Sequence, residues 1–387
     1  MSSRISTTIG DHCTVTSSKR FHLSERSDYG VPFYCSKEII QKVNGQEITE
    51  CDFIREELYE QVKKQFGVPE TGDLLITTRG TYGVPYIYRD TDKFYFADGN
   101  LTWLKDFDDE LCPEYLFYWV RSSEGQGKID AIAKGTAQKA VPIAAIKTLQ
   151  LSLPSIEDQY RIVDVLSAYD ALIENNQRQI KLLEEVAQRL YKEWFVDLHF
   201  PGYENAQITD GVPEGWSKRD VGSLIGKIER TTQIMTADYL EKGKIPIIDQ
   251  SRSFIAGYTD DTSAIVDVGS PVIVFGDHTR ILKYIQFPFA KGADGTQLII
   301  SKYNSMPQSL LYYSLVNVDL SNYHYARHFK YLKAEKIVVP TDDIAQRFDG
   351  FVEPILKRMQ RLRDEDLLLT EARDRLLPKL MSGEIEL

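Results

Sequence analysis

Two long stretches of the chain repeat apolar residues at alternating spacings of four and three, which places them along one face of a helix. Such a stripe must be buried, and a chain with two of these helices can pair them with each other. The pattern predicts two helices of about 39 residues, each about 58 Å long at 1.5 Å per residue. The predicted seam positions are Ile162, Leu166, Tyr169, Ile173, Asn176, Ile180, Leu183, Ala187, Leu190 and Trp194, then Phe348, Val352, Ile355, Met359, Leu362, Asp366, Leu369, Arg373, Leu376 and Leu380.

The two helices belong to a longer internal repeat. Residues 154–195 match residues 340–381 at an offset of 186, and Pro154 falls on Pro340. Upstream, Ala97-Asp98-Gly99 matches Ala293-Asp294-Gly295 at an offset of 196. A period this long is too large for a solenoid and indicates two copies of one unit.

The segment before each helix shows short apolar runs separated by Gly and Pro, which is typical of strands. The predicted strands are Leu74–Thr78, Val84–Tyr88, Phe94–Ala97 and Leu101–Leu104, then Val272–Phe275, Tyr284–Phe287 and Gln297–Ile300. Glu56–Phe66 and Pro113–Ser122 are predicted short helices. The fold class is therefore mixed α/β of the α+β kind. We expect β-rich domains at residues 1–153 and 201–339, and long helices at 154–200 and 340–387.

Three polar residues stand on the predicted seam: Asn176, Asp366 and Arg373. They could fix the register and orientation of the helices, as a single buried polar residue does in coiled coils. They could also form a buried Asp366–Arg373 pair or a pair across the helices. A third reading is an imperfect seam that water reaches near its middle.

The charge balance limits how the chain could contact nucleic acid. Its 387 residues carry a formal net charge of −11, which argues against a surface that is basic throughout. Any DNA contact must come from selected loops. No apolar run approaches 18 residues, and the four cysteines lack zinc or CxxC spacing, so we expect a cytoplasmic protein with free thiols and no membrane segment.

The common catalytic motifs are missing from the sequence. The run from Gly222 to Lys227 has the wrong length for a Walker A loop, and no HExxH or Asn/Asp-Pro-Pro-aromatic motif occurs. His324 and His328 are four apart without a carboxylate nearby in the sequence, so we expect no metal there. We predict that the chain is not an enzyme and holds no cofactor or metal of its own.

Several stretches, which follow one another in the family's order, resemble the specificity (S) subunit of type I restriction–modification systems. Gly72–Thr77 with Arg79-Gly80-Thr81 resembles a strand and loop of its target recognition domains, and Pro213-Glu214-Gly215-Trp216 resembles the lead-in to such a domain. The remaining matches are at the helix ends: Leu151-Ser152-Leu153-Pro154, Trp194-Phe195-Val196-Asp197 with Phe200-Pro201-Gly202, and the run from Leu377 to Ile385. The first domain lacks the Pro-x-Gly-Trp lead-in, and Gly276–Arg280 replaces the Arg-Gly-Thr loop in the second.

The resemblance implies a non-catalytic DNA reader with an internal pseudo-twofold repeat. Each target recognition domain would read one half of a bipartite site in double-stranded DNA, and an antiparallel coiled coil would hold the two domains apart. It implies two methyltransferase (M) subunits and restriction/motor (R) subunits as partners, which would carry S-adenosylmethionine, ATP and Mg²⁺. Rival readings are a modification-only system, a protein-interaction scaffold with two β-rich modules and no DNA specificity, and a nuclease with an unrecognised site.

Polar and cationic residues in Gly-rich or aromatic loops are the candidates for DNA contact, because base edges and phosphates are read by such side chains. Glycines 80, 83 and 135 are expected to serve turns only. The candidates are Lys19, Arg20, Arg79, Thr81, Tyr82, Lys134, Thr136, Gln138 and Lys139 in the first domain, and Gln250, Arg252, His278, Arg280, Tyr325, Arg327 and Lys330 in the second.

Overall fold

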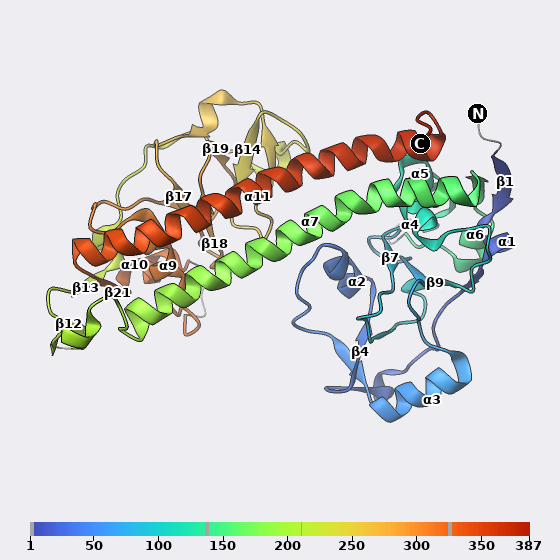
Figure 1. Ribbon diagram of the computed structural model, residues 1–387, viewed down its shortest axis with the longest axis horizontal. Coiled ribbons are helices and arrows are strands. Elements are labelled where there is room, and N and C mark those ends of the chain that lie inside the picture. Colours follow the sequence, from blue (N-terminus) through green and yellow to red (C-terminus); the bar gives the residue numbers. More distant parts are fainter. Residues whose placement is uncertain (1–3, 136–138, 210, 324–326) are drawn as a thin grey trace. The chain divides into compact units, whose positions relative to one another are not determined.

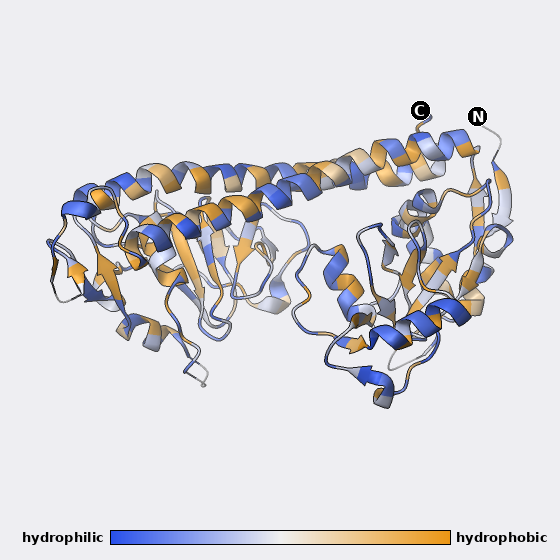
Figure 2. Cartoon of the chain, turned by 60° about the horizontal axis from the view of Figure 1, so that its bottom comes forward, coloured by the Kyte–Doolittle hydropathy of each residue, from blue (hydrophilic) through white to orange (hydrophobic). Residues whose placement is uncertain are grey.

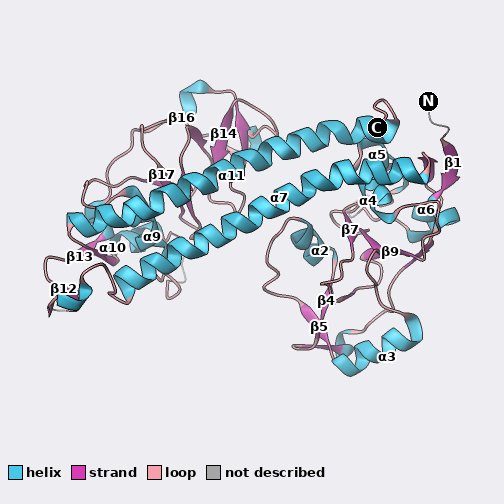
Figure 3. Cartoon of the chain, viewed as in Figure 1, coloured by secondary structure: helices cyan, strands magenta, loops and turns pink. Residues whose placement is uncertain are grey.

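The computed structural model describes residues 4–135, 139–209, 211–323 and 327–387. The chain divides into two compact units, of which the first is Met1–Asn175 with Asp366–Leu387 and the second is Asn176–Glu365. Each unit contains one β-rich domain and part of both long helices, α7 (Ile156–Tyr191) and α11 (Asp342–Ser382), as Figures 1 and 3 show. The helical segments predicted at 154–200 and 340–387 are therefore shared between the two units.

The first unit is built on three small sheets. Strand β1 (Ile5–Thr8) pairs antiparallel with β10 (Gln150–Leu153). A four-stranded sheet has the order β2 (Thr14–Thr16), β9 (Leu101–Lys105), β6 (Leu74–Thr77) and β7 (Pro85–Ile87). A second has the order β3 (Arg26–Ser27), β5 (Asp52–Ile54), β4 (Val31–Tyr34) and β8 (Tyr95–Phe96), in which β4 and β8 run parallel.

Short helices cover these sheets. They are α1 (Ile9–His12), α2 (Ser36–Val43), α3 (Glu56–Phe66), α4 (Pro113–Arg121), α5 (Ser123–Ile132), α6 (Ile143–Lys147) and a 3-10 turn at Leu23–Glu25. The core joins Leu116, Trp119 and Leu153 of the domain to Ile162 and Leu166 of α7 and to Leu377, Leu380 and Met381 of α11. The start of α7 and the end of α11 are thus part of the same hydrophobic core.

The second unit repeats this plan. Strand β13 (Ser217–Asp220) pairs with β21 (Lys336–Val339), as β1 does with β10. One sheet has the order β18 (Leu282–Ile285), β17 (Val272–Gly276) and β20 (Thr296–Ile299). The other has the order β15 (Gly257–Thr259), β14 (Ile245–Ile248), β19 (Phe289–Lys291) and β16 (Ile265–Val266), and β14 and β19 run parallel, as β4 and β8 do.

The other elements of the second unit are a small hairpin and several helices. They are β11 (Ile208–Thr209), β12 (Val212–Pro213), α8 (Val221–Leu224), α9 (Gln308–Val316), α10 (Phe329–Ala334) and 3-10 turns at Tyr203–Asn205, Thr236–Asp238 and Thr262–Ala264. The core joins Leu310 and Tyr313 of α9 to Ala187 and Tyr191 of α7 and to Phe348 of α11.

The two long helices run antiparallel where they meet within each unit. In the first unit Asp170 lies beside Arg373, and Ile162 shares a core with Leu377 and Leu380. In the second unit Gln179 accepts a hydrogen bond from Arg358, and the rings of Trp194 and Phe348 lie 6.0 Å apart between centroids in a tilted arrangement. Low numbers in α7 therefore meet high numbers in α11, as antiparallel helices require.

Every predicted seam position is buried or half-buried, and the large apolar residues exposed on the helices lie off the seam. Figure 2 shows hydrophobic and hydrophilic residues alternating along both helices. The pattern slips at two positions, because Leu356 and Leu377 are buried more deeply than their predicted neighbours Ile355 and Leu376. A straight helix has 3.6 residues per turn, so a strict heptad pattern drifts from its buried face.

Helix α7 ends in a π-helical turn, Lys192–Val196, which the heptad pattern did not predict. This turn brings both Trp194 and Phe195 into the core, and Phe195 contacts Phe348 of α11 at 5.1 Å between ring centroids. The turn thus places two consecutive aromatic side chains against α11.

Arg373 on the seam makes a pair across the helices, and the partner is Asp170 of α7. Asp170 also accepts hydrogen bonds from Tyr118 and Arg121 at 2.7 and 3.1 Å. Burial lowers the pKa of Arg373, but the hydrogen bonds to Asp170 and Asp374 outweigh this and raise it overall. Of the alternatives left open by the sequence, the cross-helix pair is present.

Candidate nucleic-acid interface

Two loops of the first domain are held together by their main chains, and we call residues 78–83 with residues 134–135 and 139–141 the first loop pair. Val141 N donates to Thr78 O at 2.9 Å, and Lys134 and Ala140 exchange two hydrogen bonds of 2.9 and 2.8 Å. Arg79 forms a β-bridge with Ala140. This frame brings the predicted residues Arg79, Lys134 and Lys139 together, all with exposed side chains.

Tight turns place these side chains. Gly80 has a φ of +70°, a backbone conformation that residues other than glycine rarely adopt. A Cβ at this position would meet nothing within 4 Å. Gly80 is therefore needed for its backbone angle. Gly83 has a φ of +77° and also lies against Gln126, where a Cβ would come within 3.0 Å of Oε1.

The other candidate residues of the first domain differ in whether they are exposed or held by contacts within the chain. Tyr82 is half-buried, and its hydroxyl bonds to Asp130, which raises its pKa, so it is tied to α5. The main-chain N of Lys19 donates to the Tyr95 hydroxyl at 2.8 Å, and its Nζ lies 5.5 Å from the centre of the Phe66 ring. Thr81 and Arg20 are exposed. Thr136 and Gln138 lie outside the described residues.

The second domain repeats the frame in residues 277–281 with Tyr323, Arg327 and His328, which we call the second loop pair. Asp277 N donates to Gly295 O at 2.7 Å, as Thr78 N donates to Asn100 O at 2.8 Å. His328 N donates to Asp277 O at 2.9 Å, as Val141 N does to Thr78 O. By these hydrogen bonds Asp277 takes the place of Thr78, and His328 takes the place of Val141.

Side chains of the second loop pair are more tightly engaged. Gln250 joins two segments, because its Nε2 donates to Asp294 O at 2.7 Å and its Oε1 accepts from His278 N at 3.1 Å. Arg280 donates to Tyr323 O at 2.8 Å from a positive φ of 62°. Both predicted readers therefore make contacts that shape the loops themselves.

Four predicted residues of this domain have exposed side chains: Arg252, His278, Arg327 and Lys330. Three of them are cations, as are Arg79, Lys134 and Lys139 in the first domain. Tyr325 lies outside the described residues, as does His324.

A buried lysine supports the segment that carries Gln250 and Arg252. Lys283 on β18 donates from Nζ to the carbonyl oxygens of Asp249 and Ser253, which lie on either side of these two residues. Burial lowers the pKa of Lys283 to about 8, and the Asp249 carboxylate opposes that shift. The sequence does not single out this lysine, because nothing in its neighbourhood marks it as buried.

Comparisons with known proteins point to one family. Residues 6–185 match the family model described as type I restriction modification DNA specificity domain. The MjaIX specificity subunit of a type I restriction enzyme from Methanocaldococcus jannaschii is 25% identical, over 81% of this chain and 78% of that protein. The HindI specificity subunit from Haemophilus influenzae is 27% identical over 36% of this chain and 31% of that protein.

A solved structure supports the same assignment at the level of the fold. The S subunit of the type I restriction–modification system from M. genitalium superposes with a TM-score of 0.59 at 16% identity, covering 98% of this chain and 96% of that one. Residues 6–185 belong to the family of type I restriction modification DNA specificity domains. Members of this family are non-catalytic, and catalysis lies in other subunits.

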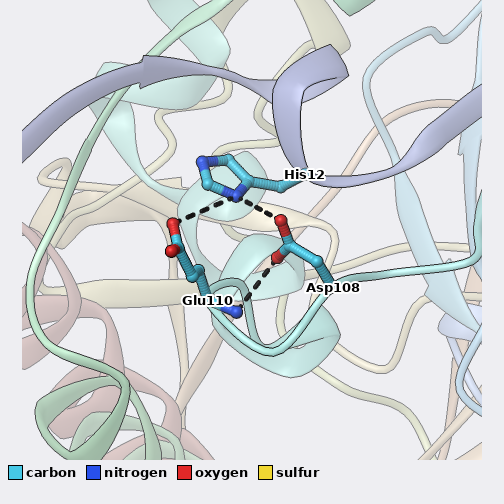
Figure 4. Close-up of side chains that lie close together, drawn as sticks. All are labelled: His12, Asp108 and Glu110. Carbon is cyan, nitrogen blue, oxygen red and sulfur yellow. Dashed lines mark hydrogen bonds and ion pairs between the residues drawn. The ribbon is translucent and has the colours of Figure 1, made fainter.

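One cluster in the chain has the spacing of a metal site, and Figure 4 shows it. His12 Nδ1 lies 2.9 Å from an Asp108 oxygen and 3.9 Å from a Glu110 oxygen, and His12 Nε2 lies 2.9 Å from the Thr7 hydroxyl. Asp108 also accepts from the main-chain N of Glu110 and of Leu111. These hydrogen bonds satisfy the histidine without an ion, so the cluster is accounted for as a link between α1 and the loop before α4.

Within the described ranges, the chain contains no helix that is long and apolar enough to cross a membrane. Both long helices carry charged residues along their outer faces.

The sequence patterns did not reveal the residues that shape these loops. Asp277 and His328 are both buried, although Asp and His are usually exposed or half-exposed. Asp277 stood in the sequence only as part of the loop that replaces Arg-Gly-Thr, and His328 only as half of an unpromising metal pair. In the sequence, the internal repeat points to these positions, because an alignment of its two copies shows where the loop residues of the two domains differ.

Proposed function

We propose that this specificity subunit reads a split sequence in double-stranded DNA, one half with each recognition domain. The observation that carries the proposal is the pair of equivalent loop frames, each of which presents a different set of exposed cations and polar groups. Base edges in the major groove are read by such side chains, and phosphates attract them. Different side chains on one frame imply different half-sites.

The proposal gives the long helices the role of a spacer. They have 36 and 41 residues, which at 1.5 Å per residue corresponds to helices of about 54 and 61 Å. Half-sites read from one face of DNA lie about one helical turn, or about 34 Å, apart, or a multiple of this. Helices of this length are long enough for that separation.

We further propose that the helices dock two methyltransferase subunits at equivalent places and also bind restriction subunits. Leu182 of α7 and Leu368 of α11 are related by the offset of 186, and they are 53% and 66% exposed. Equivalent exposed leucines suit two copies of one partner. S-adenosylmethionine, ATP and Mg²⁺ are assigned by this proposal to those partners.

The test is to sequence methylated DNA from cells that carry this chain with its neighbouring genes, against cells in which this chain alone is deleted. A split methylated motif that disappears on deletion supports the proposal and defines both half-sites. An unchanged methylation pattern, with the partner methyltransferase expressed, contradicts it. That result would favour a protein-interaction scaffold, which the net charge of −11 also suits.

A further inference from the structure

The imidazole of His328 joins the two halves of the second loop pair. The side chain is buried, with 5% of the residue exposed. Its Nδ1 lies 2.8 Å from Asp277 O in one loop, and its Nε2 lies 3.0 Å from Tyr323 O in the other. The ring thus spans from the loop that carries His278 and Arg280 to the segment that ends at Arg327.

Both partners of this ring are main-chain carbonyl oxygens, which can only accept hydrogen bonds. A ring nitrogen can therefore hydrogen-bond to either oxygen only as an N–H donor. The nearby charged groups are the Asp277 carboxylate, which accepts from Phe329 N, and the Arg280 guanidinium, which donates to Tyr323 O. The Glu335 carboxylate accepts a hydrogen bond of 2.9 Å from the Tyr323 hydroxyl.

The first domain closes the same frame without a side chain. Its equivalent of His328 is Val141, a buried apolar residue. There the main chains of Lys134 and Ala140 exchange two hydrogen bonds, which keep the ends of the loop together. The histidine therefore performs in one domain a task that the backbone performs in the other.

We propose that His328 is a positioning residue for the second half-site, fixing the two loops that carry Arg280 and Arg327 at the spacing needed to read bases. This inference rests on the proposed function. Bidentate base contacts depend on side-chain placement, and a correct pair discriminates by about 1–3 kcal/mol, or about 5- to 150-fold. Loss of the two contacts of the His328 ring, which we call the clamp, should therefore reduce base preference in one half-site. The base preference in the other half-site should be retained.

The test uses the complete system in cells and compares methylated motifs for four chains: the natural one, His328→Val, His328→Gln and Arg79→Ala. Valine is the residue of the first domain, and it removes both ring nitrogens. Glutamine keeps two N–H donors on one nitrogen. The Arg79→Ala chain serves as the matched control, because its loop lies in the other domain.

We expect His328→Val to lower base preference about tenfold or more in the half-site that Arg79→Ala leaves intact, and His328→Gln to retain most of it. A merely structural role would reduce methylation at all sites together and would not select one half-site. Unchanged preference in His328→Val, or equal loss in both half-sites, overturns the proposal.

Thermal unfolding of the purified chains shows whether each variant folds. If His328→Val does not fold, His328→Asn replaces it, since its shorter amide reaches one carbonyl at most. Equal preference in the Gln and Asn variants then overturns the proposal. If the natural chain itself gives no split motif, the proposed function fails, whereas failure of the clamp alone appears only among the variants.

Discussion

The two recognition domains share a main-chain frame and differ in what they attach to it. In the first, Thr78 and Val141 close the frame, and Arg79 follows with an exposed side chain. In the second, Asp277 and His328 hold the same places, and exposed His278 stands where Arg79 does. Hydrogen bonds between main-chain atoms do not depend on side-chain identity, so the frame can be kept while the reading residues change.

The helices show the same contrast between a shared position and different chemistry. The first unit has the Asp170–Arg373 pair between α7 and α11. At the offset of 186, the second unit has Leu356 and Ala187, both buried and apolar. At this position an ion pair joins the two helices in the first unit, and apolar side chains pack there in the second. The residues of one unit can therefore be replaced by those of the other as a test.

The largest expected effect comes from breaking the charged junction. Arg373→Ala leaves the partly buried Asp170 carboxylate without its cross-helix partner, and we expect a loss of about 2–3 kcal/mol in the free energy of unfolding. Denaturant unfolding of the purified chain measures it. The double variant Asp170→Leu with Arg373→Ala copies the second unit and should regain much of the loss, because an apolar pair of similar volume often replaces a buried ion pair. Unchanged stability in Arg373→Ala would show that the pair contributes nothing.

The next effect concerns the exposed residue of the first loop pair. Arg79→Ala should lower discrimination in one half-site by about 5- to 150-fold, the range expected for one good base contact. The frame is made by the main chain and should remain, so co-purification with the methyltransferase subunit is expected to be unaffected. Methylation motifs and pull-down yields measure the two readouts. Loss of co-purification would show that Arg79 is structural.

A smaller change should follow from making the α7 seam more like that of α11. Nδ2 of Asn176 is buried without a hydrogen-bond partner among the described residues, and the equivalent position at the offset of 186 is the buried Leu362. Asn176→Leu should therefore raise the free energy of unfolding by about 1–2 kcal/mol. A control substitution at the exposed Gln177 should change the free energy of unfolding little. A destabilised Asn176→Leu chain would instead show that the amide is required for the pairing.

The smallest effect is a pH dependence specific to the second domain. Lys283 has a folded pKa of about 8, below its usual value of about 10.5, so the unfolded chain binds the proton more tightly. Stability from this group therefore rises as pH increases through that window, by about 1 kcal/mol between about pH 7.5 and about pH 9. Lys283→Met should lack this increment in matched unfolding curves. If the free energy of unfolding changes equally with pH in the natural chain and in Lys283→Met, this contribution of Lys283 is excluded.

The sequence predicted the regular elements well because their signal is local. The seam spacing placed α7 and α11, and apolar runs placed β6, β9 and β17 within a residue or so of their ends. β18 begins two residues earlier than predicted, at Leu282, because Lys283 looks polar in the sequence although it is buried. Tertiary burial overrode the residue type there.

The roles within the candidate interface could not be predicted, because they depend on contacts between distant segments. Gln250 looked like a base reader, yet its amide joins segments near residues 278 and 294. Asp170 was not recognised as the partner of Arg373, since 203 residues separate them. Such pairings follow from the folded arrangement and leave no trace in spacing or composition.

The most direct test of the account asks whether each domain reads its own half-site. Methylated motifs would be determined in cells for the natural chain, for Arg79→Ala and for Arg327→Ala, which carries the change in the second loop pair. We predict a split motif in which each variant weakens base preference in a different half. This prediction is contradicted if both variants weaken the same half, or if both halves lose preference together in either one.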